Sequence, residues 1–105
     1  MKVIKNFEID KGPLFSVLVT GECLQFGFAR IPVNQCLPQT GVSKHPTEEI
    51  CIVMKGSIRV ETPEGIEYLN AGDISFMPED VEHRNVNVGD TEVEMFWYTA
   101  PPTVV

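Results

Sequence analysis

The chain has few basic residues and no long apolar run, and each shortage excludes a class of protein. The chain has eight Lys and Arg and fifteen Asp and Glu, which gives a net charge of -7. Nucleic-acid binding needs clustered cations, and a membrane-binding surface needs a basic face. No apolar run approaches the roughly 20 residues that cross a bilayer. We therefore expect neither a nucleic-acid partner nor a membrane partner.

Cysteine is also scarce, with Cys23, Cys36 and Cys51 as the only three residues of this type. An odd number without a CxxC pair supports neither a disulfide framework nor a thiolate zinc site. The N-terminus carries lysines and no apolar signal-peptide core, so we expect a cytoplasmic protein. A length of 105 residues with 43% hydrophobic residues predicts one domain over 1–105.

Short apolar runs separated by Gly, Pro, Asn and Asp dominate the chain. No window shows the 3.6-residue apolar period of a helix, and regularly spaced short runs are typical of a β-sandwich or barrel. The segment 32–44 reads as a long loop. The runs that we expect to form strands are 15–20, 24–31, 50–54, 57–62, 66–69, 73–77, 84–88 and 92–98. The interior of such a barrel should hold Phe26, Phe28, Phe76, Phe96, Trp97, Met54, Met77 and Met95.

The two histidines of the chain, His45 and His83, stand out together with Glu49. Imidazole and carboxylate are ligands that Zn²⁺ and Fe²⁺ accept. On a helix, the spacing of His45 and Glu49 would place them about 5–6 Å apart. On a straight strand they would lie about 13 Å apart, so the alternative is a bend between them. The β-branched residues after Glu49 favour the bend, with Glu49, Cys51 and Val53 then facing the interior.

These residues resemble the two motifs of the cupins. The first motif ends in His, three or four residues, Glu, six residues and Gly, and His45, Glu49 and Gly56 match it. The second runs from Gly through Pro-x-Gly to His and Asn, and it is matched by Gly72, Pro78, His83 and Asn87. The motifs occupy residues 43–56 and 72–87. The resemblance implies a single double-stranded β-helix barrel of the jelly-roll kind.

The chain also departs from the cupin motifs. The family's first His falls on Ser43, its leading Gly on Leu37, and the Gly of Pro-x-Gly on Asp80. The resemblance therefore implies three ligands for a divalent transition metal (Zn, Fe, Mn or Ni), namely His45, Glu49 and His83. Serine is a poor ligand, so Ser43 is expected to hold a water or a ligand side chain. Thr47 and Asn85 are further candidates for the pocket, and Cys51 is either a core residue or a pocket residue.

Two functions follow from the resemblance. The first is a small metal-dependent enzyme acting on a small molecule, with lyase, isomerase and dioxygenase chemistry all open. No general base stands out, so the catalytic residues stay unknown. The alternative is a non-catalytic module that binds a sugar or a carboxylate with weak metal binding or none. A homodimer is expected, with the segment 3–9 and the aromatic strand 92–98 as contacts.

Overall fold

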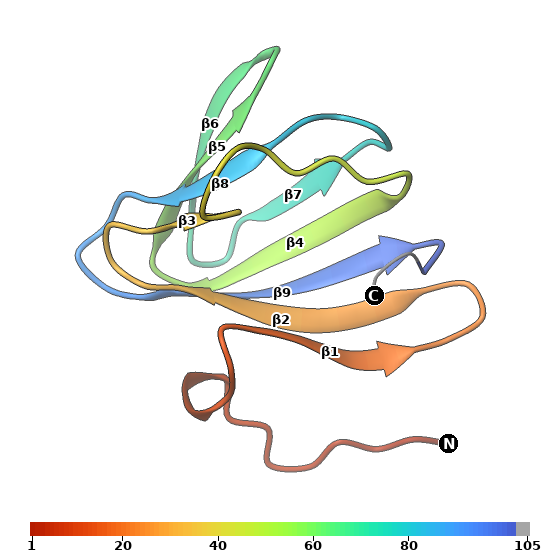
Figure 1. Cartoon of the computed structure of the whole chain (residues 1–105). Helices are drawn as coiled ribbons and strands as arrows, with labels where there is room; N and C mark the ends of the chain where they lie inside the picture. Colours follow the sequence, from red (N-terminus) through yellow and green to blue (C-terminus); the bar gives the residue numbers. More distant parts are fainter. Residues whose placement is uncertain (103–105) are drawn as a thin grey trace.

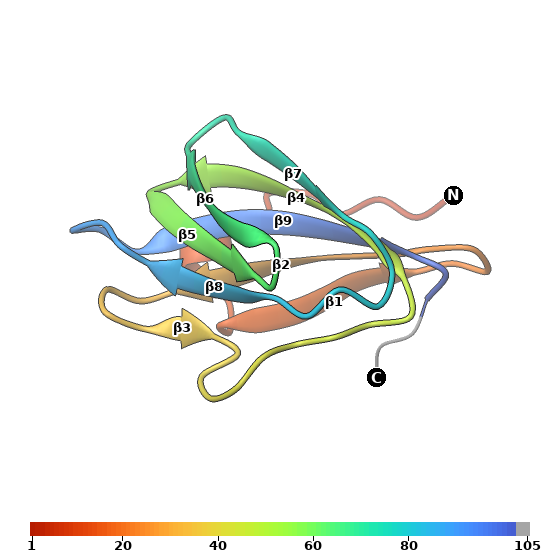
Figure 2. The same ribbon diagram turned by 90° about the horizontal axis from the view of Figure 1, so that it is seen from above.

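The structure is a computed structural model that describes residues 1–102, and its strands form two antiparallel sheets that face each other (Figures 1 and 2). Sheet A has five strands in the order β1-β2-β9-β4-β7, and sheet B has four in the order β3-β8-β5-β6. The elements are η1 (Ile9–Lys11), β1 (Phe15–Thr20), β2 (Gln25–Ile31), β3 (Cys36–Leu37), β4 (Glu48–Lys55), β5 (Ser57–Thr62), β6 (Gly65–Asn70), β7 (Ile74–Met77), β8 (Arg84–Asn87) and β9 (Val93–Ala100).

The predicted all-β class is confirmed, and each of the eight expected runs corresponds to one strand. The short strand β3 lies inside the segment that was predicted to be a loop. It pairs with β8 through Cys36↔Val86 and Leu37↔Asn85. Two residues are too few to produce a recognisable alternation, so only the partner strand reveals them. Among residues 1–102, no helix is long and apolar enough to span a membrane.

Strand β4 shows how the sequence divides the two faces of sheet A. Its residues alternate between the inside and the outside, so Cys51 and Val53 are buried while Ile50 and Ile52 are 37% exposed. The strand ends at Gly56, whose φ is +87°. A Cβ at Gly56 would lie 3.0 Å from the carbonyl oxygen of Glu92. Glycine is therefore needed here both for the turn and for the close approach of the β9 segment.

The hydrophobic core lies between the two sheets. Sheet A supplies most of it, and sheet B supplies two aliphatic residues of β5. The buried cluster consists of Ala29, Ile31, Cys51, Val53, Ile58, Val60, Val93, Met95 and Trp97.

The expectation that the strand aromatics fill the interior is confirmed for Trp97 and wrong for Phe26, Phe76 and Phe96, while Phe28 is buried but on the other face of sheet A. Phe28 pairs in register with Phe96, and Phe26 with Tyr98, so these rings lie on the opposite face of sheet A from Trp97. Phe76 is 56% exposed and Met54 is 53% exposed on the same outer face. Side chains of a strand point alternately to its two faces. Because the rows that include Glu49 and Trp97 face inward, the residues between them, including these aromatic residues, face outward.

The N-terminal segment covers part of this outer face. The ring of Phe7 lies 5.0 Å from that of Phe28 and 5.8 Å from that of Phe96. Phe28 is consequently only 1% exposed although it points away from the core. The segment runs outside β1 (Figure 1), and it leaves the part of the face over β4 and β7 uncovered.

Candidate functional site

Glu49 lies on the inner face of β4, one residue after the strand begins. His45 precedes the strand in a stretch without helical structure, and the chain bends at residues 46–47 before Glu48 enters the sheet. The structure thus adopts the bend rather than the helix that the spacing of His45 and Glu49 left open. Pairing of Glu49 with Met77 on one side and Thr99 on the other holds its backbone between β7 and β9 of sheet A.

Backbone hydrogen bonds join the two histidine segments. The amide of Ser43 donates to the carbonyl of His83 at 2.8 Å, and the amide of His83 donates back to Ser43 at 2.9 Å. The amide of Asp80 donates to the carbonyl of His45 at 2.7 Å. Asp80 has a φ of +61°, a conformation that glycine adopts freely and that aspartate tolerates. Ser43 is therefore held by its backbone, and Asp80 still forms the turn that its position requires.

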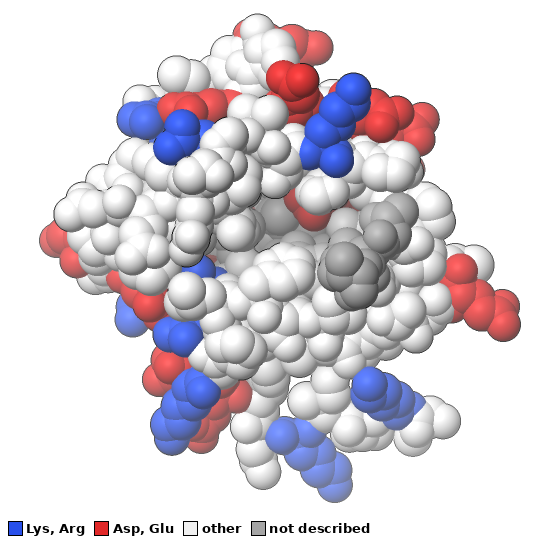
Figure 3. Space-filling view, viewed as in Figure 1, with Lys and Arg blue, Asp and Glu red and all other residues white. Residues whose placement is uncertain are grey.

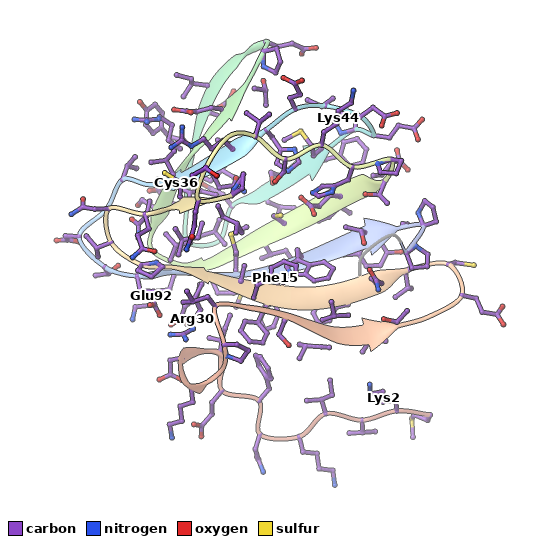
Figure 4. All side chains as sticks on the ribbon, in the orientation of Figure 1. Lys2, Phe15, Arg30, Cys36, Lys44 and Glu92 are labelled. Carbon is purple, nitrogen blue, oxygen red and sulfur yellow. The ribbon has the colours of Figure 1, made fainter. Side chains whose placement is uncertain are left out.

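A cavity of about 220 Å³ lies between the two sheets at this point. Figure 3 shows the surface hollowed near the centre of the view, with atoms of acidic residues visible inside. Phe15 lies beside this region (Figure 4). The polar residues that line the cavity are Ser43, His45, Glu49, His83, Asn85 and Thr99. The other lining residues are Phe15, Ala29, Leu37, Cys51, Met95 and Trp97.

His83 and Glu49 form the centre of the polar lining. The side chain of His83 is 6% exposed and that of Glu49 is 17% exposed, with 3.8 Å between His83 Nε2 and Glu49 Oε1. His83 Nδ1 lies 2.9 Å from the carbonyl oxygen of Val81. A carbonyl oxygen can only accept, so Nδ1 carries a hydrogen, and Nε2 is the ring nitrogen that faces Glu49. The ring of His45 lies 5.5 Å from that of His83, centroid to centroid.

Cys51 faces the same cavity and stays a neutral thiol. Its Sγ donates to Glu49 Oε1 at 3.8 Å. Burial, and secondly the negative charge of Glu49, raise the pKa of the Cys51 thiol far above its usual range, because both disfavour the thiolate. Cys51 is thus both a core residue and a pocket residue, and it is not an activated nucleophile.

The comparison with protein families agrees with the geometry. A model of the cupin domain matches residues 35–99, which include both histidine segments. The chain belongs to the cupin family. No curated protein matches it.

Solved structures with the same cupin fold include a Bacillus halodurans protein with a TM-score of 0.83 and 20% identity, covering 92% of this chain and 77% of that one. An RmlC-like cupin from Methanocaldococcus jannaschii, described as a double-stranded β-helix, has a TM-score of 0.81 and 19% identity over 96% and 92% of the two chains. A cupin domain from Bordetella pertussis has a TM-score of 0.69 and 27% identity over 84% and 92%. These likenesses establish the fold.

The metal that the cupin resemblance implies was tested against the side chains present. Within the described part of the chain, no group of three His, Cys, Asp or Glu residues converges closely enough to hold an ion. The donor types nevertheless suit a borderline cation, and His45, Glu49 and His83 line one cavity. The contact of His83 Nδ1 with the Val81 carbonyl also leaves Nε2 as the nitrogen on the side of Glu49. The donor set therefore fits a metal in its chemistry, with Glu49 and His83 closest to a shared position.

The structure also shows which predicted pocket residues reach the cavity. Ser43, Cys51 and Asn85 line it, whereas Thr47 is buried at 2% exposure and is not part of the lining. Thr99 lines the cavity at 2% exposure, and its Oγ1 has no hydrogen-bond partner within residues 1–102. Sequence reasoning missed Thr99, Phe15 and Leu37 as pocket residues. Only the pairing register of β9 with β2 and β4 brings Thr99 opposite Glu49.

Proposed function

We propose that this cupin binds a small molecule in the cavity between its sheets. The observation that carries the proposal is the division of the lining into a polar group around Glu49 and His83 and an apolar group around Trp97 and Met95. Binding sites for small molecules typically combine an apolar wall with a few convergent polar groups. A volume of about 220 Å³ lies below the roughly 300–1,000 Å³ of drug-sized sites, which favours a compact ligand.

The chain offers its own probe for this proposal. Trp97 is the single tryptophan, and it lines the cavity, so its fluorescence should report occupancy. We expect a saturable change in Trp97 emission with at least one member of a panel of small alcohols, amines and carboxylates. The variant Ala29→Leu places a larger side chain in the lining and should abolish the change while circular dichroism shows an intact fold. A panel without any saturable response would contradict the proposal.

A divalent transition metal at the same site is a second candidate. It is favoured by the 3.8 Å approach of His83 Nε2 to Glu49 Oε1, with Nδ1 already bonded to the carbonyl of Val81. His45, Glu49 and His83 would hold the ion, and Ser43 and Asn85 would border its open positions. When bound, the metal would polarise a carbonyl or activate water. The residues of the chain would orient the ligand, and the apolar wall would exclude solvent.

Calorimetric titration with Zn²⁺ and Mn²⁺ after chelator treatment tests the metal candidate. We expect binding that falls at least tenfold in Glu49→Gln and in His83→Ala. Glu48→Gln is the matched control, because Glu48 is the neighbouring carboxylate and points to the outer face of β4. Equal affinities in Glu49→Gln and the wild type would exclude metal binding at this site.

We also propose that the protein forms a homodimer through the outer face of sheet A. The uncovered part of this face carries large apolar side chains whose exposed fractions are high. These are Ile50 at 37%, Ile52 at 37%, Met54 at 53%, Ile74 at 65%, Phe76 at 56% and Tyr98 at 38%. Together they expose several hundred Å² per copy, which approaches the roughly 800 Å² per partner of a standard interface.

A second copy suits this face better than a different partner. The six residues form neighbouring rows on β7, β4 and β9, such as Phe76-Ile50-Tyr98. Two such faces can pack as a sandwich related by a two-fold axis. Charged groups such as the Lys55–Glu94 pair lie at the end of the rows and not among them. Phe7 already covers the adjoining part of the face, so N-terminal segments would border the interface. Light scattering should give twice the 11.7 kDa of one chain.

A further inference from the structure

A groove lies between strands β6 and β7, and each of these strands is the edge of its sheet. Among the strands of residues 1–102, β7 pairs only with β4 and β6 pairs only with β5. One side of each strand therefore presents backbone N–H and C=O groups without a strand partner. The groove between the two edges has a volume of about 600 Å³. Open edges beside a groove are where proteins take up an extended segment.

The groove is apolar along its floor, and its charged side chains are acidic. Leu69 and Met77 are among the apolar lining residues. Glu64 and Glu67 line the groove as well, whereas no Lys or Arg of residues 1–102 does. Glu67 pairs in register with Val60, which is buried, so this carboxylate stands on the inner face of sheet B. Neither glutamate forms an ion pair within residues 1–102. The groove thus suits an extended segment that is both apolar and basic.

The start of this chain has that composition. The first five residues read Met-Lys-Val-Ile-Lys, and all of them are exposed. Val3 is 57% exposed and Ile4 is 43% exposed. None of the ion pairs within residues 1–102 includes Lys2 or Lys5. The ammonium of Lys2 donates to the carbonyl of Leu18 at 3.0 Å in an exposed position, and water can replace such a bond. The segment is therefore apolar, basic and free to take a partner.

The segment lies too far from the groove of its own chain. It runs outside β1, which is one edge of sheet A, whereas β7 is the opposite edge (Figure 1). Phe7 holds the segment on the outer face of this sheet, against Phe28 and Phe96. When two such faces pack about a two-fold axis that runs along the strands, the β1 side of each copy lies next to the β7 side of the other. The groove of a second copy is then the one within reach.

We propose that, in the dimer, the first five residues of each copy lie extended in the partner's groove between β6 and β7. This inference rests on the proposed homodimer and adds a second contact to it. Lys2 and Lys5 are three residues apart, as are Glu64 and Glu67, so one register along β6 brings each lysine to one glutamate. Five extended residues span roughly 17 Å, which fits along the roughly 20 Å of a strand of six residues such as β6.

Charge reversal with rescue tests the proposal. Sedimentation equilibrium of the full chain gives the dimer dissociation constant of three variants: Glu64→Lys with Glu67→Lys, Lys2→Glu with Lys5→Glu, and all four substitutions together. We expect each pair alone to raise the dissociation constant about tenfold or more, because like charges then meet in the groove. The four together should return it to within about threefold of the wild type, because opposite charges face each other again.

A matched control and a second variant complete the experiment. Glu22→Lys with Asp90→Lys reverses two exposed acidic residues outside the groove lining and should leave the dissociation constant within about twofold of the wild type. Val3→Ser with Ile4→Ser changes only side chains that are exposed in the single copy. It should weaken the dimer severalfold, and it tests the segment even if the groove variant does not fold.

The possible outcomes separate this inference from the homodimer itself. A groove variant that dimerises as the wild type does, while Phe76→Glu weakens the dimer, would overturn the groove contact and leave the homodimer in place. A fourfold variant that dimerises no better than either pair alone would overturn the pairing of the segment with the groove. A wild-type chain that sediments as one copy of 11.7 kDa at every concentration would overturn both proposals.

Discussion

The two sheets differ in what they present to their surroundings. The outer face of sheet B carries charged pairs, such as Arg59 Nε with Glu61 Oε2 at 2.8 Å, and Arg84 bonds to Cys36 Sγ at 3.0 Å. The outer face of sheet A carries apolar rows over β4 and β7. An antiparallel sheet can leave one face in water when that face is polar. On sheet B these charged groups alternate with the exposed side chains of Ile66 and Tyr68, whereas the apolar rows of sheet A are continuous across three strands, which is why the proposed dimer contact lies on sheet A.

Sheet A also carries most of the cavity on its inner face. Glu49, Cys51, Trp97 and Thr99 come from β4 and β9, whereas sheet B contributes Asn85 and the β3 residue Leu37, and His83 immediately precedes β8. The same two strands therefore serve the pocket on one side and the proposed dimer contact on the other. Substitutions on either face of these two strands should therefore affect the pocket or the proposed dimer contact.

Removing the largest inward side chain of sheet A should have the greatest effect. Trp97→Ala leaves a cavity in the core and removes the bond to Phe28, and we expect a loss of about 3–5 kcal/mol in the free energy of unfolding. Tyr68 lies on the outer side of β6 and is 62% exposed. Tyr68→Ala should therefore change the free energy of unfolding by less than about 0.5 kcal/mol. Urea unfolding followed by circular dichroism measures both. Similar losses in the two variants would contradict this division of inner and outer residues.

The loss of Asn87, which links the two sheets, should lower the free energy of unfolding nearly as much as Trp97→Ala does. Asn87 of β8 donates to the carbonyl oxygens of Ile31 in β2 and of Thr91, at 2.8 and 2.9 Å, and accepts from the amide of Gly89. Asn87→Ala removes all three hydrogen bonds of this buried side chain, which should cost about 2–3 kcal/mol in the free energy of unfolding. Asn70→Ala, an exposed asparagine on β6, is the control in the same urea experiment. An equally small loss in both variants would exclude Asn87 as a connection between the sheets.

The outer faces themselves can be compared directly by charge insertion. Phe76→Glu on sheet A should weaken the dimer by about 2 kcal/mol or more, as for a central interface residue. Tyr68→Glu adds the same charge to sheet B at a similarly exposed position and should leave the dimer intact. Sedimentation equilibrium gives the dissociation constant of each. Dissociation by Tyr68→Glu with an unaffected Phe76→Glu would place the interface on the other sheet.

The smallest effect is expected for the ion pair of sheet B. The Arg59 and Glu61 side chains are 32% and 31% exposed, so solvent screens their attraction. Glu61→Gln should cost less than about 1 kcal/mol in the free energy of unfolding, as for exposed pairs in general. Urea titrations in low and high salt measure the difference. A loss of several kcal/mol would mean that the polar face of sheet B is more than a solvated surface.

The candidate site was predicted from spacing, and only part of the pocket around it was, namely Ser43, Cys51 and Asn85. His45, Glu49 and His83 were found because the motif spacing is local to each segment. Phe15 and Thr99 belong to strands far from the motifs in the sequence, and their approach depends on pairings such as β1 with β2 and β2 with β9. Strand register is a tertiary property, because a shift of one residue exchanges the inner and outer rows.

The sequence by itself determined that this protein is a single all-β cupin domain with two histidines and a glutamate in one region. Alternation of apolar residues and the positions of Gly and Pro suffice for the all-β class, since both act over a few residues. The family and the candidate ligands came from the resemblance of the spacing around His45, Glu49 and His83 to the cupin motifs. Only the tertiary structure decided that Phe76 and Phe96 face outward and that Glu49 lies in a cavity whose lining, within residues 1–102, includes no Lys or Arg. Those facts depend on which strands pair and in which register, and therefore on contacts between distant segments.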